Sequence, residues 1–117
     1  MREPIRDRGR LEHIIIAIDD ATTFAGKTTL EELQYDKLRC YALVHSVQII
    51  GEAAYKLTRE FRSNHPEVAW NDIIGMRHVL VHDYYTVDIS LLWNVVHEEL
   101  PPLRKQIAEY LASNSSL

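Results

Sequence analysis

Apolar residues recur at steps of three and four along almost the whole chain, and this spacing limits the possible folds most strongly. Near the start, Leu11, Ile14, Ile15, Ile18 and Ala21 form one such series. On a helix of about 3.6 residues per turn, side chains at these steps share one face. Only four glycines and four prolines interrupt the 117 residues, and the two-residue alternation of strands is nearly absent. The sequence therefore predicts an all-α fold.

The spacing predicts a first helix over about residues 7–25, ended by Gly26. Thr29 and Glu32 have capping-box spacing and open either a short helix or the second long one. The second long helix should cover about residues 36–63, ended by Asn64-His65-Pro66. It carries two adjacent apolar stripes, which place it in the middle of a bundle. They comprise Val47, Ile50, Ala54, Leu57 and Phe61, and Leu38, Ala42, Ile49 and Ala53.

A third helix should begin between residues 68 and 71 and end between residues 83 and 86. Asp88 is a good N-cap for a fourth helix. Pro101 and Pro102 interrupt that helix, and we expect a kink or a break into two helices there because proline lacks a backbone donor. The sum is four or five antiparallel helices in an up-and-down bundle.

Length and composition predict the number of domains, the compartment and the kinds of binding site. We expect a single domain over residues 1–117, with an ordered core of about residues 7–112. The net charge of −4 gives no overall basic field, so a nucleic-acid site would have to be a local basic cleft. Cys40 is the single cysteine, which favours a reducing cytoplasm. We expect no membrane span and no signal peptide, because no long apolar run is present.

Residues 77–84, Arg-His-Val-Leu-Val-His-Asp-Tyr, gather groups that bind anions and move protons. Arg77 offers a planar fork suited to phosphate, and His82 can act as a general acid or base. Together they suit attack of a ribose 2′-hydroxyl on the neighbouring phosphate without a metal, with arginine stabilising the transition state. On a continuous helix these two side chains lie about 140° apart. They converge only if the helix loosens near His82 or if a second copy completes the site.

Other interpretations of these residues stay open at this point. Arg77 could simply pair with a carboxylate, and His82 could cap a helix C-terminus. His78 and His82 have the four-residue spacing of a zinc pair, although nothing selects further ligands. A polar stripe on the second helix either is exposed or places Glu52 or His45 opposite Arg77, where a carboxylate would orient the guanidinium. The stripe comprises His45, Gln48, Glu52 and Tyr55.

The ordered set Arg77, His82 and Tyr84 resembles the R-x-x-x-x-H-x-Y pattern of HEPN-domain proteins of the HepT type, the toxins of HepT–MntA toxin–antitoxin pairs. The surrounding residues 73–84 are similar to the family's IIGMRN-x-LVH-x-Y, and residues 49–54 and 88–101 are similar as well. The resemblance covers about residues 11–111. One departure is His78, where the family often has asparagine.

The resemblance implies a helical homodimer with active sites near its interface. It implies metal-independent RNA cleavage by Arg77 and His82. Among the neighbouring polar residues we expect His78, Asp83, Glu52 and His45 to support this pair. It also implies a partner, an antitoxin that is a minimal nucleotidyltransferase of the MNT type. That partner would use ATP to adenylylate Tyr84, so this chain needs no cofactor of its own. The added AMP would bring negative charge into the phosphate site.

A second hypothesis is a non-catalytic helical subunit that presents Tyr84 to a transferase or helps to form its nucleotide site. The acidic net charge leans toward this interpretation, because it does not favour RNA. A purely structural bundle is the third hypothesis. Loss of cleavage on substitution of Arg77 or His82, with the fold intact, separates the nuclease from the other two.

Overall fold

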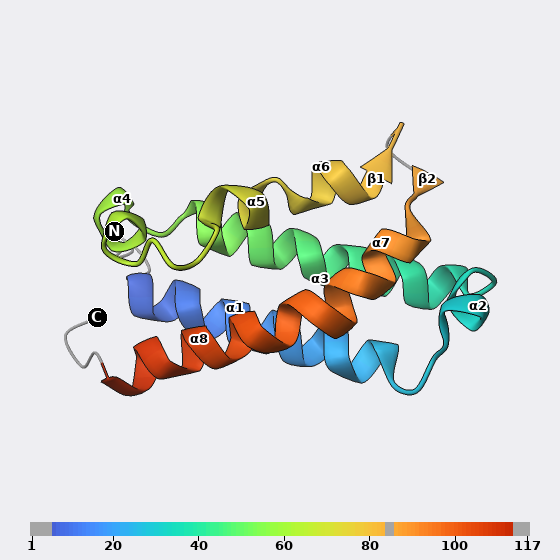
Figure 1. The fold of residues 1–117 in the computed structure, drawn as a ribbon, viewed down its shortest axis with the longest axis horizontal. Helices are drawn as coiled ribbons and strands as arrows, with labels where there is room; N and C mark the ends of the chain where they lie inside the picture. Colours follow the sequence, from blue (N-terminus) through green and yellow to red (C-terminus); the bar gives the residue numbers. More distant parts are fainter. Residues whose placement is uncertain (1–5, 84–85, 114–117) are drawn as a thin grey trace, which may run out of the picture.

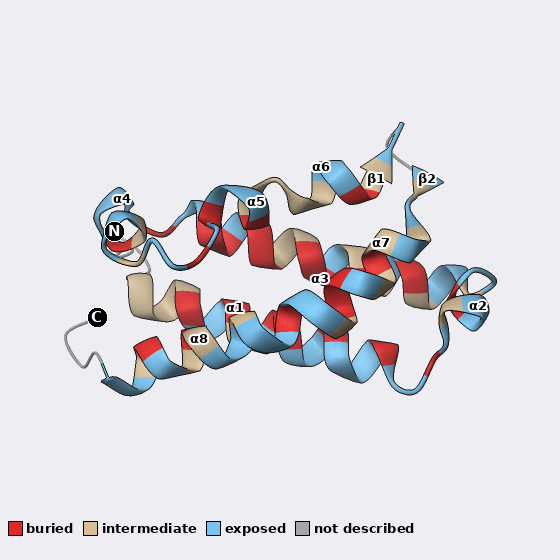
Figure 2. Cartoon of the chain, viewed as in Figure 1, coloured by how far each residue is buried: buried red, intermediate tan, exposed pale blue. Residues whose placement is uncertain are grey.

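Two long antiparallel helices form the centre of the molecule, which a computed structural model describes over residues 6–83 and 86–113. They are α1 (Asp7–Ala25) and α3 (Lys37–Tyr55). Their facing stripes are buried, and Leu11, Ile14 and Ile50 are each at most 1% exposed. Burying one such side chain is worth about 1.5–3 kcal/mol, so this seam supplies much of the folding free energy. Figure 2 shows the buried residues gathered along it.

The boundaries of α1 confirm the helix predicted over residues 7–25. Gly26 ends it with a positive φ of 53°, a conformation that glycine adopts without the strain of a Cβ atom. The Thr29–Glu32 capping box is formed and opens a separate short helix, α2 (Leu30–Leu33). Asp36 then caps α3 by accepting a hydrogen bond from the Arg39 backbone.

The helix predicted over residues 36–63 is two helices, and this part of the prediction is wrong. The first helix, α3, ends at Tyr55, and α4 spans Arg59–Asn64. The break has a physical cause in Thr58, whose side chain caps α4 by accepting from the Phe61 amide. Its own backbone N–H and hydroxyl donate to the Asp7 carboxylate, at 2.9 and 2.8 Å.

The apolar stripe of Val47, Ile50, Ala54, Leu57 and Phe61 is buried as expected. In the second predicted stripe, Ala53 is buried and Ala42 and Ile49 are half-buried. Leu38, by contrast, is 84% exposed, and its assignment to the core is wrong. It lies in the first turn of α3, beyond the reach of the helices that cover the middle.

The third predicted helix also divides. It forms α5 (Trp70–Ile74) and α6 (Met76–Leu80), and the chain then becomes extended. Two short antiparallel strands follow, β1 (Val81–His82) and β2 (Thr86–Val87), paired Val81 with Val87 and His82 with Thr86. The periodicity could not reveal a two-residue strand pair, because so few positions show no alternation.

The last helical stretch comprises α7 (Ile89–Asn94), a π-helical segment (Val95–Glu99) and α8 (Leu100–Ser113). Asp88 caps α7 as predicted, accepting from the Leu91 amide. At the predicted kink or break at Pro101–Pro102, the structure instead has the π-helical segment just before the prolines. The Leu100 amide donates to the Val95 carbonyl, five residues back. The prolines supply no donors for the next α-helical bonds, so the ladder adjusts upstream.

The chain runs up and down through the bundle, first along α1, then back along α3, then along α5 and α6, and finally back along α7 and α8 (Figure 1). Helix α8 packs on α1, and α5 and α6 pack on α3. The all-α, up-and-down architecture is thus confirmed, with the short hairpin as an addition. No helix within residues 6–83 and 86–113 combines the length and apolar character needed to cross a bilayer.

Candidate functional site

Arg77 lies on α6 against the middle of α3, and its guanidinium is half-buried without a protein partner in the described part of the chain. Its Nε atom is buried and forms no hydrogen bond to any described residue. No described carboxylate lies within 4 Å to form an ion pair with it, in contrast to Arg39 and Arg104. A buried donor without an acceptor is costly, so an anion that reached this guanidinium would gain a charged donor that no described carboxylate occupies.

Two adjoining pockets flank Arg77. The first has a volume of about 380 Å³, and its lining includes Gly51, Glu52 and His78. The second, of about 370 Å³, includes Tyr41, His45 and Val81. Gln48 lines both pockets, as does Arg77, so these two side chains separate them. Both volumes lie within the range of small-ligand sites.

The predicted polar stripe of α3 therefore faces Arg77, but without an ion pair. Glu52 and His45 are exposed and contribute to opposite pockets. The Glu52 carboxylate instead accepts a hydrogen bond from Gln48 Nε2 at 3.2 Å. The expectation that a carboxylate directly orients the Arg77 guanidinium is not met among the described residues.

Gly51 allows the end of α5, and with it the following helix α6, to pack close against α3. A Cβ atom on Gly51 would lie 3.1 Å from the Ile73 carbonyl oxygen and 3.2 Å from that of Ile74. The missing side chain lets the C-terminal end of α5 touch α3, and Arg77 follows three residues after Ile74. Gly51 was not among the candidate site residues. The available signal was a glycine inside a strong helical pattern, which marks close packing.

His82 lies beyond the end of α6. This meets one of the two conditions under which Arg77 and His82 can reach the same ligand, namely that the helix loosens near His82. Helix α6 ends at Leu80, and His82 is the exposed second residue of β1. The Asp88 amide donates to the Leu80 carbonyl at 2.8 Å and ties the hairpin to the start of α7. Val81 lines the second pocket beside Arg77, and successive strand residues point to opposite faces. His82 is thus directed away from that pocket within one chain.

Asp83 begins the hairpin turn with a φ of 50°, a left-handed conformation that aspartate tolerates better than most residues. Its carboxylate is exposed. Tyr84, the predicted modification site, and Tyr85 lie outside the described residues. His78 is exposed on α6 and lines the first pocket.

The four-residue spacing of His78 and His82 does not place the two imidazoles on one helix face as a zinc pair would require, because α6 ends between them. Across residues 6–83 and 86–113, no three histidine, cysteine or acidic side chains gather closely enough to hold a metal ion. The arrangement offers instead a cation, Arg77, and exposed imidazoles at the end of α6. Groups of these types are able to bind a phosphodiester and to transfer protons.

A family model described as ribonuclease HepT-like matches residues 14–110 of this chain. A protein of Caldanaerobacter subterraneus subsp. tengcongensis, named as a candidate RNase, is 36% identical over 89% of this chain and 93% of its own length. One of Methanocaldococcus jannaschii, named likewise, is 32% identical over 83% and 89%. The probable ribonuclease HepT of Thermococcus cleftensis is 35% identical over 80% and 86%. No solved structure matches this chain.

Proposed function

This chain belongs to the HepT-like ribonuclease family, and we propose that it cleaves RNA as a metal-independent endoribonuclease toxin at Arg77 and His82. The observation that carries the proposal is the half-buried Arg77 guanidinium, which has no acceptor among the described residues and opens onto two pockets. An arginine in this state binds a phosphodiester oxygen in place of an internal carboxylate.

In the proposed reaction the ribose 2′-hydroxyl attacks the adjacent phosphorus, and the 5′-oxygen of the next nucleotide leaves. His82 takes the hydroxyl proton or protonates the leaving oxygen. Arg77 stabilises the negative charge that builds on the non-bridging oxygens. The products are a 2′,3′-cyclic phosphate and a 5′-hydroxyl, so no oxidant, metal or cofactor enters the balance.

A second copy of the chain completes the site in this proposal. His82 is directed away from the pocket beside Arg77 within one chain, so a substrate held by both needs a cleft between copies. A largely exposed stripe of α3 runs past both pockets and gives such a contact surface. Its members are Leu38, Tyr41, His45, Gln48, Glu52 and Tyr55, of which Leu38 is 84% and Tyr55 60% exposed. Exposed apolar residues in one row are typical of protein interfaces.

The cognate partner in this proposal is an antitoxin of the MNT nucleotidyltransferase type, which transfers AMP from ATP to Tyr84. In the sequence the motif tyrosine follows His82 by two residues. An AMP group there adds bulk and negative charge close to the histidine and opposes binding of another phosphate.

Cleavage of a single-stranded RNA by the purified protein tests the proposal. We expect wild type to cut in the presence of a chelator and to leave 2′,3′-cyclic phosphate ends. Arg77→Ala should lose about 2.7–4 kcal/mol of transition-state stabilisation, which is roughly a hundredfold to a thousandfold in rate. Absence of cleavage by the wild type, with unmodified mass, would favour the non-catalytic subunit instead.

The partner proposal needs a separate experiment. Incubation with a minimal nucleotidyltransferase of the MNT type, ATP and magnesium should raise the intact mass by one or more AMP units and stop cleavage. Tyr84→Phe should keep its mass and remain active under the same conditions. Modification of Tyr84→Phe at another residue would refute Tyr84 as the target.

A further inference from the structure

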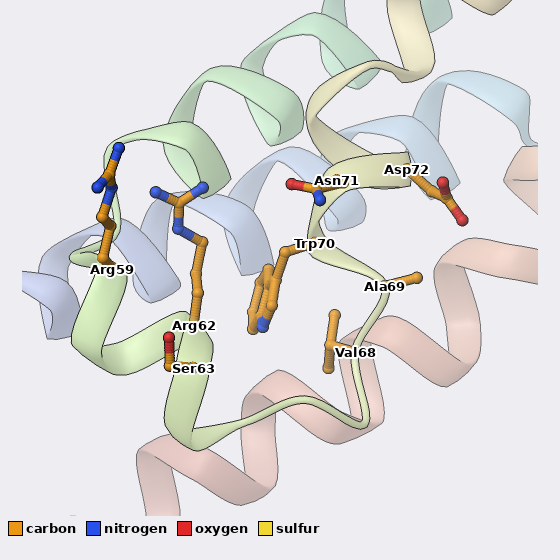
Figure 3. Close-up of a pocket in the computed structure, with 8 residues that line it drawn as sticks. All are labelled: Arg59, Arg62, Ser63, Val68, Ala69, Trp70, Asn71 and Asp72. Atoms are coloured by element: carbon orange, nitrogen blue, oxygen red, sulfur yellow. The ribbon is translucent and has the colours of Figure 1, made fainter.

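A second region of interest is a pocket apart from Arg77, between α4 and the start of α5, and none of its residues takes part in the proposed cleavage. Its volume is about 570 Å³. Figure 3 shows Arg59 and Arg62 extending from α4 in the same direction along one side. Ser63, Trp70 and Asn71 also line it.

The two arginines lack internal partners among the described residues. Neither forms an ion pair with a described carboxylate. The Arg62 Nε atom is buried and makes no hydrogen bond to any described residue, which is the state found at Arg77. The single acidic residue of the lining is Asp72, and its side chain points away from both guanidinium groups (Figure 3). The pocket therefore presents donors and positive charge.

An aromatic cluster holds the floor of this pocket in place. The Trp70 indole N–H donates to the His65 carbonyl at 2.9 Å, and the His65 ring stacks on Phe61 with centroids 4.1 Å apart. Tyr110 of α8 packs on both rings of that stack and donates its hydroxyl to Glu67. Trp70 is only 6% exposed, so it supports the arginine stems and does not offer a stacking face for a base.

This pocket and the pocket beside Arg77 are lined by neighbouring residues of the same two segments of the chain. Asn71 lines this pocket, and Ile74 and His78, three and seven residues later, line the pocket beside Arg77. On the α3 side, Lys56 lines that pocket and precedes Arg59 by three residues. From Gln48 to the end of α3 at Tyr55 the helix rises about 10 Å, which is a span of a few nucleotides.

From these observations we infer that Arg59 and Arg62 form a phosphate-binding subsite for the backbone of the RNA strand that is cut at Arg77 and His82. This inference rests on the proposed nuclease function. It explains how a chain of net charge −4 holds a polyanion. The two pockets together present four cationic side chains to such a strand, those of Arg77, Lys56, Arg59 and Arg62.

The test measures binding of a single-stranded RNA of about twelve nucleotides, a length within the usual range of single-strand sites. Its riboses are 2′-O-methylated, so the attacking hydroxyl is absent and wild-type protein can be used. The double variant Arg59→Gln with Arg62→Gln should bind roughly tenfold more weakly, similarly for different sequences. The slope of log affinity against log salt should fall by about 1.4, which corresponds to about 0.7 for each lost phosphate contact.

Two further variants separate this subsite from general charge and from folding. Arg104→Gln with Lys105→Gln removes the same charge from α8, outside both pockets, and should bind like wild type. Arg59→Lys with Arg62→Lys keeps the charge and should restore most of the salt slope. Equal weakening by both glutamine pairs would overturn the inference, because it would reduce the effect to net charge.

The failure of this inference is distinguishable from failure of the nuclease function. If Arg77→Ala abolishes cleavage while the Arg59/Arg62 glutamine variant binds RNA like wild type, the subsite is refuted and the nuclease stands. If that glutamine variant binds RNA normally but escapes inhibition by the nucleotidyltransferase, the pocket binds the partner protein, and the RNA subsite is again refuted. If wild type neither binds nor cuts RNA, both proposals are wrong.

Discussion

Adding one methyl group at Gly51 should displace Arg77 without unfolding the protein. In Gly51→Ala the new Cβ atom would lie 3.1 and 3.2 Å from two backbone oxygens at the end of α5. Because neither oxygen belongs to a flexible side chain, α5 itself must move by a few tenths of an ångström. Helix α6 follows α5 directly, so Arg77 moves with it.

The stability change is small because two effects oppose each other. Overpacking costs about 1–3 kcal/mol, and alanine gains about 1 kcal/mol over glycine inside a helix. The net loss is then about 0–2 kcal/mol. Taking an unfolding entropy of about 2.1 cal/mol/K per residue over 117 residues, the melting temperature should fall by at most about 8 °C. Thermal unfolding followed by circular dichroism measures this.

The cleavage rate should respond more than the stability. A displacement of 1 Å can cost about a hundredfold in rate, so a few tenths should cost roughly threefold to tenfold. Gly75→Ala is the matched control, since its Cβ atom would meet nothing closer than the Asn71 carbonyl oxygen at 3.4 Å. If Gly51→Ala cuts RNA at the wild-type rate, the contact between α3 and α5 does not position Arg77, and the reasoning is refuted.

Three further changes have expected outcomes. Asp7→Ala removes both acceptors of Thr58 and should cost about 1 kcal/mol, or about 4 °C in melting temperature, which thermal unfolding measures. The hydrogen bond from Arg104 lowers the pKa of Asp19, so this pair stabilises the fold above the usual aspartate pKa and loses its effect as pH falls through the lowered value. Asp19→Asn should therefore cost a few tenths of a kcal/mol near neutral pH, and its melting curve should merge with that of wild type in acid. Leu38→Ser should shift a dimer toward monomer in sedimentation, because Leu38 is 84% exposed on the proposed interface.

Each of these predictions has a result that would contradict it. An unchanged melting temperature for Asp7→Ala would mean that Thr58 caps α4 without the carboxylate. A constant difference between wild type and Asp19→Asn across the acid range would remove the ion pair as its cause. Ile16→Ser, at a residue 57% exposed on α1, is the control for Leu38→Ser. Equal dissociation by both serine variants would contradict an interface on α3.

The sequence predicted the helices well where a local signal marks their ends. Gly26, the Thr29 capping box and the Asp88 N-cap each act within a few residues, and the structure confirms all three. The break at residues 56–58 depends on Asp7, fifty-one positions before Thr58. Nothing in the local spacing of apolar residues contains that contact, so the two helices were predicted as one.

At the site, too, the features that depend on local sequence were predicted, and those that depend on contacts between segments were not. One of the two interpretations of the polar stripe of α3 placed it opposite Arg77, and residues of the stripe line the same pockets as Arg77. Loosening of the helix near His82 was also anticipated, and α6 ends at Leu80. The orientation of His82 depends on strand pairing across the hairpin, and the closeness of α5 depends on Gly51. Both arise from packing between segments, which periodicity along one segment cannot give.

The most direct test of the central claim compares the RNA cleavage rate of His82→Ala with that of His13→Ala. Both variants remove one exposed imidazole, from β1 and from α1 respectively. If His82 carries protons in the reaction, His82→Ala should lose roughly a hundredfold or more in rate with an unchanged melting temperature, while His13→Ala retains the wild-type rate. Equal rates for the two folded variants would contradict the account, because cleavage would not then depend on His82.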